Sequence, residues 1–140
     1  MDLSAAYDVL NHGVFLRKAS AYGFDDNCVQ WLRSYLSGRS QVVEVGSERS
    51  TYLHLDSGTP QGSPLSCLLF ALYVGDLPLW ISKKNVFPIA YADDTFLTVE
   101  AETEDALKIR LEEEGKEVLR FFSSNELIAN PGKTGLLVIR

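Results

Sequence analysis

Two adjacent aspartates, Asp93 and Asp94, lie between two strand-like runs, within the stretch IAYADDTF at residues 89–96. The run NVFPIAY precedes them and TFLTVE follows them. Both runs are rich in β-branched and aromatic residues, which favours two strands joined by a tight turn. Adjacent carboxylates repel one another, and burying either without a partner is costly. The pattern therefore predicts a β-hairpin with the two aspartates at its tip and their side chains on opposite sides.

The rest of the chain indicates helices mixed with hairpins, without the strict βαβ alternation of a parallel sheet, so an α+β fold is expected. The signals are capping residues, alternating stretches and Gly/Pro-rich loops. The expected elements, in chain order, are a helix ending near Gly23, a helix capped by Asp25 or Asp26, a hairpin within 41–58, a loop at 58–64, a buried helix at 64–77, the two strands around the aspartates, an amphipathic helix at 103–125, a loop at 125–134 and a final strand at 135–139.

Length and composition indicate one globular domain. The chain has 140 residues, of which 46% are hydrophobic, enough for one core. The longest apolar run, CLLFALYV at 67–74, is too short to span a bilayer, so no membrane association is expected. No secretory leader opens the sequence, which favours an intracellular protein. The net charge of −6 reflects acidic residues concentrated at 100–117, a pattern typical of a solvated helix face.

A divalent cation would relieve the repulsion between Asp93 and Asp94, because Mg²⁺ takes carboxylate oxygens and leaves positions for phosphate oxygens. Such a site needs a carboxylate from a second element. Asp2 is the candidate, at the start of DLSAAYD just before a turn into a helix. Two simpler interpretations remain open, a polar turn for the aspartate pair and a helix cap for Asp2. Asp8 is interpreted as a structural turn or cap residue.

Four motifs, DLSAAYD, GTPQGSPLS, YADD and NPGKT, occur in this order. Together they resemble the palm of a reverse transcriptase. The stretches LLFALYVGDLP and YGF…W…SYLSGRSQ are most similar to the non-LTR (LINE-type) retrotransposon lineage. The resemblance covers nearly all of residues 1–140. It implies a right-hand polymerase palm, an RRM/ferredoxin-like antiparallel sheet with helices on one face, lacking its first strand, the fingers and the thumb.

The resemblance also implies roles for individual residues. Asp2 and Asp93 would be the principal ligands of two Mg²⁺ ions, for which Mn²⁺ can substitute. Asp94 would lie near the metals, and the backbone carbonyl of Leu3 would also coordinate one. With these ions the chain would catalyse two-metal transfer of a nucleotide to a primer 3′-hydroxyl.

Further residues are expected to hold the substrates. Tyr7 would lie under the incoming sugar, where its ring would clash with a 2′-hydroxyl. Gln61 would brace the template strand and the incoming nucleotide, and Gly62 would let the backbone approach the duplex. Lys133 would contact the triphosphate and protonate the departing pyrophosphate. It does not belong to a phosphate-binding P-loop, because Leu127 stands where that motif needs glycine.

The implied function is that of an RNA-directed DNA polymerase domain fragment of a retrotransposon, located in the nucleus or cytoplasm. Its implied partners are an RNA template, a DNA primer, dNTPs and the fingers and thumb of a longer parent protein. The alternative is a non-catalytic remnant derived from such an element, or an interaction module. Metal-dependent primer extension would separate the two hypotheses.

Overall fold

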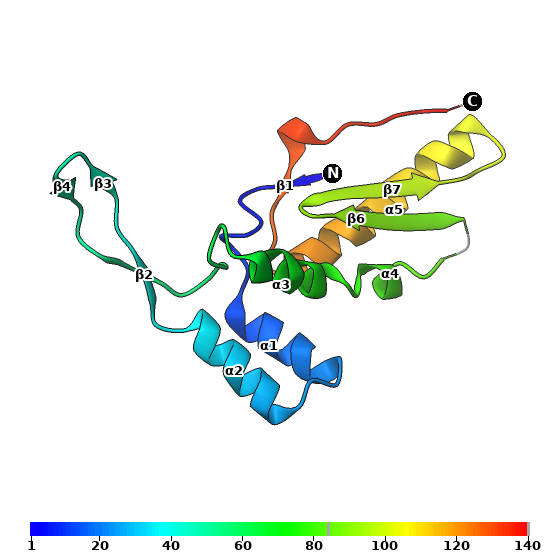
Figure 1. Ribbon diagram of the computed structural model, residues 1–140. Helices are drawn as coiled ribbons and strands as arrows, with labels where there is room; N and C mark the ends of the chain where they lie inside the picture. The colour runs from blue at the N-terminus through cyan, green and yellow to red at the C-terminus, as the bar shows by residue number, and fades with distance from the viewer. Residues whose placement is uncertain (84, 140) are drawn as a thin grey trace.

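The computed structural model describes residues 1–83 and 85–139, and it shows the expected mixture of helices and small antiparallel sheets (Figure 1). The helices are α1 (His12–Ala21), α2 (Asp26–Leu36), α3 (Pro64–Val74), α4 (Leu77–Trp80), α5 (Glu104–Ser124) and the 3₁₀ helix η1 (Pro131–Lys133). The strands are β1 (Asp2–Leu3), β2 (Arg39–Gln41), β3 (Glu44–Val45), β4 (Glu48–Arg49), β5 (Leu53–Leu55), β6 (Val86–Tyr91), β7 (Asp94–Val99) and β8 (Ala129–Asn130).

The helices begin where the sequence places capping residues. The Asp25 side chain accepts a hydrogen bond from the N–H of Cys28 at the start of α2, and Thr103 caps α5 in the same way. Ser63 caps α3, with a proline in the first turn. The apolar helix expected over 64–77 is interrupted near Gly75, so α3 ends at Val74 and a separate short helix, α4, follows.

The central strands lie in the order β6–β7–β1–β8. The six residues of β6 pair with the six of β7, and β1 pairs with β8, both antiparallel. Two backbone hydrogen bonds connect these ribbons. The N–H of Thr95 donates to the carbonyl of Met1 (2.8 Å), and the amino group of Met1 donates to the carbonyl of Thr95 (2.6 Å). Within the described residues the strands therefore form two-stranded antiparallel ribbons, and the expected single palm sheet stays a prediction.

Aromatic side chains of α3 and α5 form the centre of the core. Phe70, Tyr73, Phe121 and Phe122 are almost fully buried. Helix α1 packs against α2 and α3. The half-buried Lys18 on α1 donates to the carbonyl of Tyr73 and to Asp76, both at 2.6 Å, which connects α1 to the end of α3.

The segment between α2 and α3 forms an extended arm, drawn in cyan to green in Figure 1. Strand β2 pairs with β5, and β3 pairs with β4 at the end of the arm. The hairpin expected within 41–58 is confirmed. Its strands are largely exposed, including Val45 and Leu53.

Two expectations for the last part of the chain are wrong. The segment 135–139 is not a strand, and Leu136 and Ile139 are largely exposed. A strand requires a neighbour for its backbone groups, and no pairing of this segment exists among the described residues. The expected loop at 125–134 instead contains β8 and η1, because β1 supplies a partner for Ala129–Asn130.

One acidic residue of α5 departs from the expected solvated face. Glu114 is buried, and one of its oxygens lies 2.9 Å from the Nζ of Lys83. Its other oxygen, Oε2, is buried without a hydrogen-bond partner. The acidic run at 100–117 therefore lies mostly on the solvated face of the helix, as expected, and Glu114 is the exception.

Candidate active site

Asp93 and Asp94 lie at the tip of the β6–β7 hairpin, as the sequence predicts. Tyr91 pairs with Asp94, so Ala92 and Asp93 form a two-residue loop. Ala92 has a φ of 52°, the left-handed conformation that tight hairpin turns need. Asp93 is half-buried and Asp94 is exposed, so the two carboxylates occupy different environments.

Asp2 reaches the hairpin tip through backbone pairing. Met1 and Thr95 form an antiparallel hydrogen-bonded pair, so the next residues on the two strands, Asp2 and Asp94, occupy adjacent positions. Leu3 follows with its side chain in the core and its backbone paired with Ala129. The structure therefore brings Asp2 and Asp94, which are about ninety residues apart in the chain, to adjacent positions on neighbouring strands.

The Asp2 carboxylate is nearly enclosed and incompletely satisfied. Its side chain is 17% exposed, and Oδ2 is buried without a hydrogen-bond partner. The Nζ of Lys133 lies 3.5 Å from Oδ2, a distance that allows an ion pair but not a hydrogen bond. A buried carboxylate oxygen in this state is a suitable ligand for a cation.

Lys133 lies in a short turn that is held by two hydrogen bonds. The side chain of Asn130 accepts a hydrogen bond from the N–H of Gly132 (3.0 Å), and Thr134 donates to the carbonyl of Asn130 (2.9 Å). These bonds close the 3₁₀ turn of η1 at the end of β8. Because β8 pairs with β1, the turn projects Lys133 over Asp2.

Tyr7 lies between the core and the carboxylates. Its ring packs against Phe70 with centroids 4.9 Å apart. Burial raises the pKa of its hydroxyl, with further contributions from Cys67 and from the negative charge of Asp93. The Tyr7 ring therefore packs on the core within electrostatic reach of Asp93.

The Gly/Pro-rich loop is bonded to the segment that follows Tyr7. The Nε2 of Gln61 donates to Oδ1 of Asp8 (2.6 Å), and the N–H of Thr59 donates to the carbonyl of Tyr7 (2.8 Å). Gly58 packs so closely that an added Cβ would lie 2.7 Å from the carbonyl oxygen of Asp8. Gly62 has a φ of 84° and open space around it.

Asp8 and His12 lie beside the Gln61 loop, although the sequence motifs do not mark them as candidate site residues. The structural role expected for Asp8 includes accepting the hydrogen bond from the Gln61 amide. His12 Nε2 lies 2.7 Å from the carbonyl of Gly58. Both line a hollow of about 630 Å³ beside Gln61. In the sequence, both residues follow the DLSAAY stretch closely. Only the fold shows that this part of the chain lies opposite the Gln61 loop.

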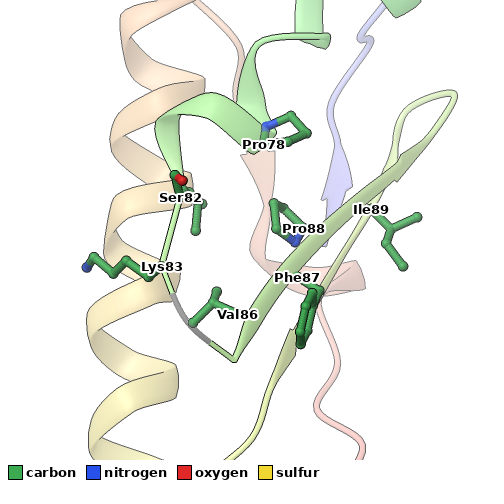
Figure 2. Close-up of a pocket in the computed structure, with 8 residues that line it drawn as sticks. Pro78, Ser82, Lys83, Val86, Phe87, Pro88 and Ile89 are labelled. Atoms are coloured by element: carbon green, nitrogen blue, oxygen red, sulfur yellow. The ribbon is translucent and has the colours of Figure 1, made fainter.

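A second hollow, of about 690 Å³, lies between α4 and β6 (Figure 2). Pro78, Val86, Phe87 and Ile89 line it, with Lys83 at one end. Its walls are mostly apolar and contain none of the aspartates above. The carboxylate site and the Gln61 hollow are therefore the better candidates for chemistry.

The chain's residues fit a divalent cation in part. The Oδ2 of Asp2, which has no hydrogen-bond partner, and the adjacent Asp94 carboxylate are the kind of oxygen ligands that Mg²⁺ prefers. However, no group of three or more His, Cys, Asp or Glu side chains among the described residues is close enough to hold a metal ion. A cation here would need further ligands, for example substrate phosphate oxygens.

Comparison with known families identifies the chain. The model of the family described as reverse transcriptase (RNA-dependent DNA polymerase) matches residues 1–138. The chain belongs to the reverse transcriptase family. This membership confirms the resemblance carried by the DLSAAYD, GTPQGSPLS, YADD and NPGKT motifs.

Curated relatives of this reverse transcriptase chain come from mobile elements of insects. It is 25% identical over 107 residues to the Retrovirus-related Pol polyprotein from type-1 retrotransposable element R2 of Popillia japonica, over 69% of the chain and 18% of that protein. It is 29% identical over 117 residues to the RNA-directed DNA polymerase from mobile element jockey of Drosophila funebris, over 77% of the chain and 13% of that protein. It is 37% identical over 76 residues to the probable RNA-directed DNA polymerase from transposon X-element of Drosophila melanogaster, over 52% of the chain and 8% of that protein.

These relatives are non-LTR retrotransposon proteins, the lineage that the flanking stretches indicated. The chain spans less than a fifth of the length of each of them. Within its described residues, no helix is both long and apolar enough to cross a membrane.

Proposed function

We propose that residues 1–140 form part of the palm of an RNA-directed DNA polymerase, which adds dNTPs to a primer 3′-hydroxyl on an RNA template. The observation that carries the proposal is the pairing of Met1 with Thr95, which sets Asp2 beside the Asp93–Asp94 tip. The strand order β6–β7–β1–β8 is compatible with an RRM-like palm sheet. The fingers and thumb would come from other parts of a longer protein.

Asp2 and Asp93 would be the principal holders of two Mg²⁺ or Mn²⁺ ions, with Asp94 and the carbonyl of Leu3 close by. When bound, such ions lower the pKa of the attacking hydroxyl and neutralise phosphate charge. The protein's own contribution is to hold these oxygens in place through the hairpin turn and the β1 pairing. The buried Oδ2 of Asp2 supports this role.

The remaining residues would position the nucleotide. Lys133 would contact the triphosphate and supply a proton to the leaving pyrophosphate; its 68% exposure and its ion pair with Asp2 support this role. Tyr7 is backed by Phe70, so its ring cannot retreat easily from a 2′-hydroxyl. Gln61, oriented by Asp8, would brace the template and nucleotide, and Gly62 would allow close approach of a strand.

Thermal melting with a nucleotide and metal tests this site. The chain would be melted with and without Mn²⁺ plus dTTP, beside Asp2→Asn and Asp93→Asn. Ligand at ten times its dissociation constant should stabilise the wild type by about 1.4 kcal/mol. Asp56→Asn is a matched control, because that side chain is 90% exposed on the arm.

Stabilisation lost in both site variants and kept in Asp56→Asn would support a formed site. Equal stabilisation in all four proteins would contradict the assignment of Asp2 and Asp93. Metal-dependent extension of a DNA primer on an RNA template then tests catalysis itself. A formed site without extension would favour the non-catalytic alternative for this stretch of chain.

A further inference from the structure

Three side chains form a continuous stack along one side of α2 and into β2. The rings of Trp31 and Tyr35 lie 5.7 Å apart with only 14° between their planes. The guanidinium carbon of Arg39 lies 5.0 Å from the centre of the Tyr35 ring. The Nε of Arg39 also donates to the carbonyl of Tyr35 (2.9 Å), which fixes the guanidinium against the ring.

The stack begins on the core and ends in solvent, because the half-buried Tyr35 packs against the core while its two neighbours in the stack are exposed. Helix α2 buries its other side through Val29, Leu32 and Leu36, while Trp31 is 57% exposed and Arg39 is exposed. A tryptophan ring contributes a large apolar surface when it is covered. The exposed Trp31 ring is therefore the part of the stack suited to a planar partner, and Tyr35 supports it from below.

The stack is connected to the loop assigned to the template. The hydroxyl of Tyr35 donates to the Oγ of Ser63 (2.8 Å), two residues after Gln61. Arg39 and Gln61 line the same hollow. The stack is thus joined to the Gln61 loop by the Tyr35–Ser63 bond and by the hollow that Arg39 and Gln61 share.

We propose that Trp31, Tyr35 and Arg39 form a base-stacking surface for an unpaired nucleic-acid strand on its way to Gln61. Unpaired bases stack on aromatic rings and on arginine guanidinium planes, and arginine also binds backbone phosphates. This inference rests on the proposed polymerase function and deepens it, because it assigns a path to the unpaired template. An apolar protein partner is the competing occupant, but the stacked guanidinium and the continuity with the Gln61 loop favour a nucleic acid.

Tryptophan fluorescence tests the proposal directly. The chain has two tryptophans, so Trp80→Phe leaves Trp31 as the only reporter. This replacement keeps an aromatic ring against Phe121. The probe is a single-stranded oligouridylate of about ten nucleotides, within the usual site sizes, and its control is an abasic phosphodiester of equal length and charge. Both titrations are done in EDTA without dNTPs.

We expect the oligouridylate to quench Trp31 and to bind about tenfold more tightly than the abasic oligomer, because stacking is worth that order per base. In anisotropy measurements with a labelled oligonucleotide, Trp31→Leu and Tyr35→Leu should each lose about tenfold in affinity. Tyr35→Phe should keep it, since only the bond to Ser63 is removed. Circular dichroism checks the fold of each variant.

Equal affinity for the two oligomers, or binding without quenching, would overturn the proposal, and so would no binding at all. Self-association that depends on Trp31 in analytical ultracentrifugation would instead identify a second copy as the occupant. The assay contains no metal and no nucleotide. If the melting test of Asp2 and Asp93 fails, the result of this oligonucleotide assay can therefore still be interpreted by itself.

Discussion

Gly58 is the residue whose replacement tests the site architecture most sharply. It has a φ of 81°, and an added Cβ would lie 2.7 Å from the carbonyl oxygen and 2.9 Å from the Cα of Asp8. Both are backbone atoms, so no side-chain rotation can relieve the contact. Gly58→Ala must therefore move the loop away from Asp8. That movement strains the hydrogen bonds from Gly58 to Leu10 and from Thr59 to Tyr7, both 2.8 Å.

The expected cost has two parts. An L-residue in the left-handed region costs roughly 1–2 kcal/mol. Two weakened hydrogen bonds add roughly 0.5–1.5 kcal/mol each. The free energy of unfolding should thus fall by about 3 kcal/mol in Gly58→Ala. Urea denaturation followed by far-UV circular dichroism measures it, with linear extrapolation to water.

Gly23→Ala is the matched control. Gly23 has a similar φ of 90°, but nothing lies within 4 Å of its added Cβ. Only the conformational strain applies there, so its loss should stay at roughly 1–2 kcal/mol. A loss in Gly58→Ala no larger than that in Gly23→Ala would refute the close approach of the loop to Asp8.

Three further predictions follow from the site and the core. Asp8→Ala should weaken dNTP binding about fivefold in melting titrations, because the Gln61 amide loses a 2.6 Å bond, and Asp8→Asn should retain most of the affinity. Lys133→Met should tighten Mn²⁺ binding to the nucleotide-free protein by roughly 1.5- to 5-fold in calorimetry, because a cation competing for Asp2 is removed; unchanged Mn²⁺ affinity would contradict that competition. Burial raises the pKa of Tyr73 to about 12 from 10.0. Because the folded-state pKa is raised, the contribution of Tyr73 to stability is complete below pH 10.0 and is lost as the pH rises towards about 12. Urea denaturation at a series of pH values should show this fall in the free energy of unfolding of the wild type. The fall should be smaller in Tyr73→Phe.

Local signals in the sequence predicted most helices and the β6–β7 hairpin correctly. Asp25 and Thr103 cap helices within three residues of themselves, so a short window contains the whole interaction. The β6–β7 hairpin is similarly local, because its strands are joined by a two-residue loop. The predictions failed where a partner was distant. Ala129–Asn130 became a strand because β1 lies beside it, and the segment 135–139 did not because no strand pairs with it.

The sequence by itself supplies the residue types of the site, and its four ordered motifs are sufficient to indicate a reverse transcriptase palm. Their mutual placement depends on contacts that no local pattern contains. The Met1–Thr95 pair closes a separation of 94 residues, and it brings Asp2 beside the hairpin tip. The Gln61–Asp8 bond and the link from Tyr35 to Ser63 have the same long-range character. Side-chain chemistry and turn propensity are local properties, whereas the meeting of two carboxylates is decided by which backbone groups find partners when the core forms.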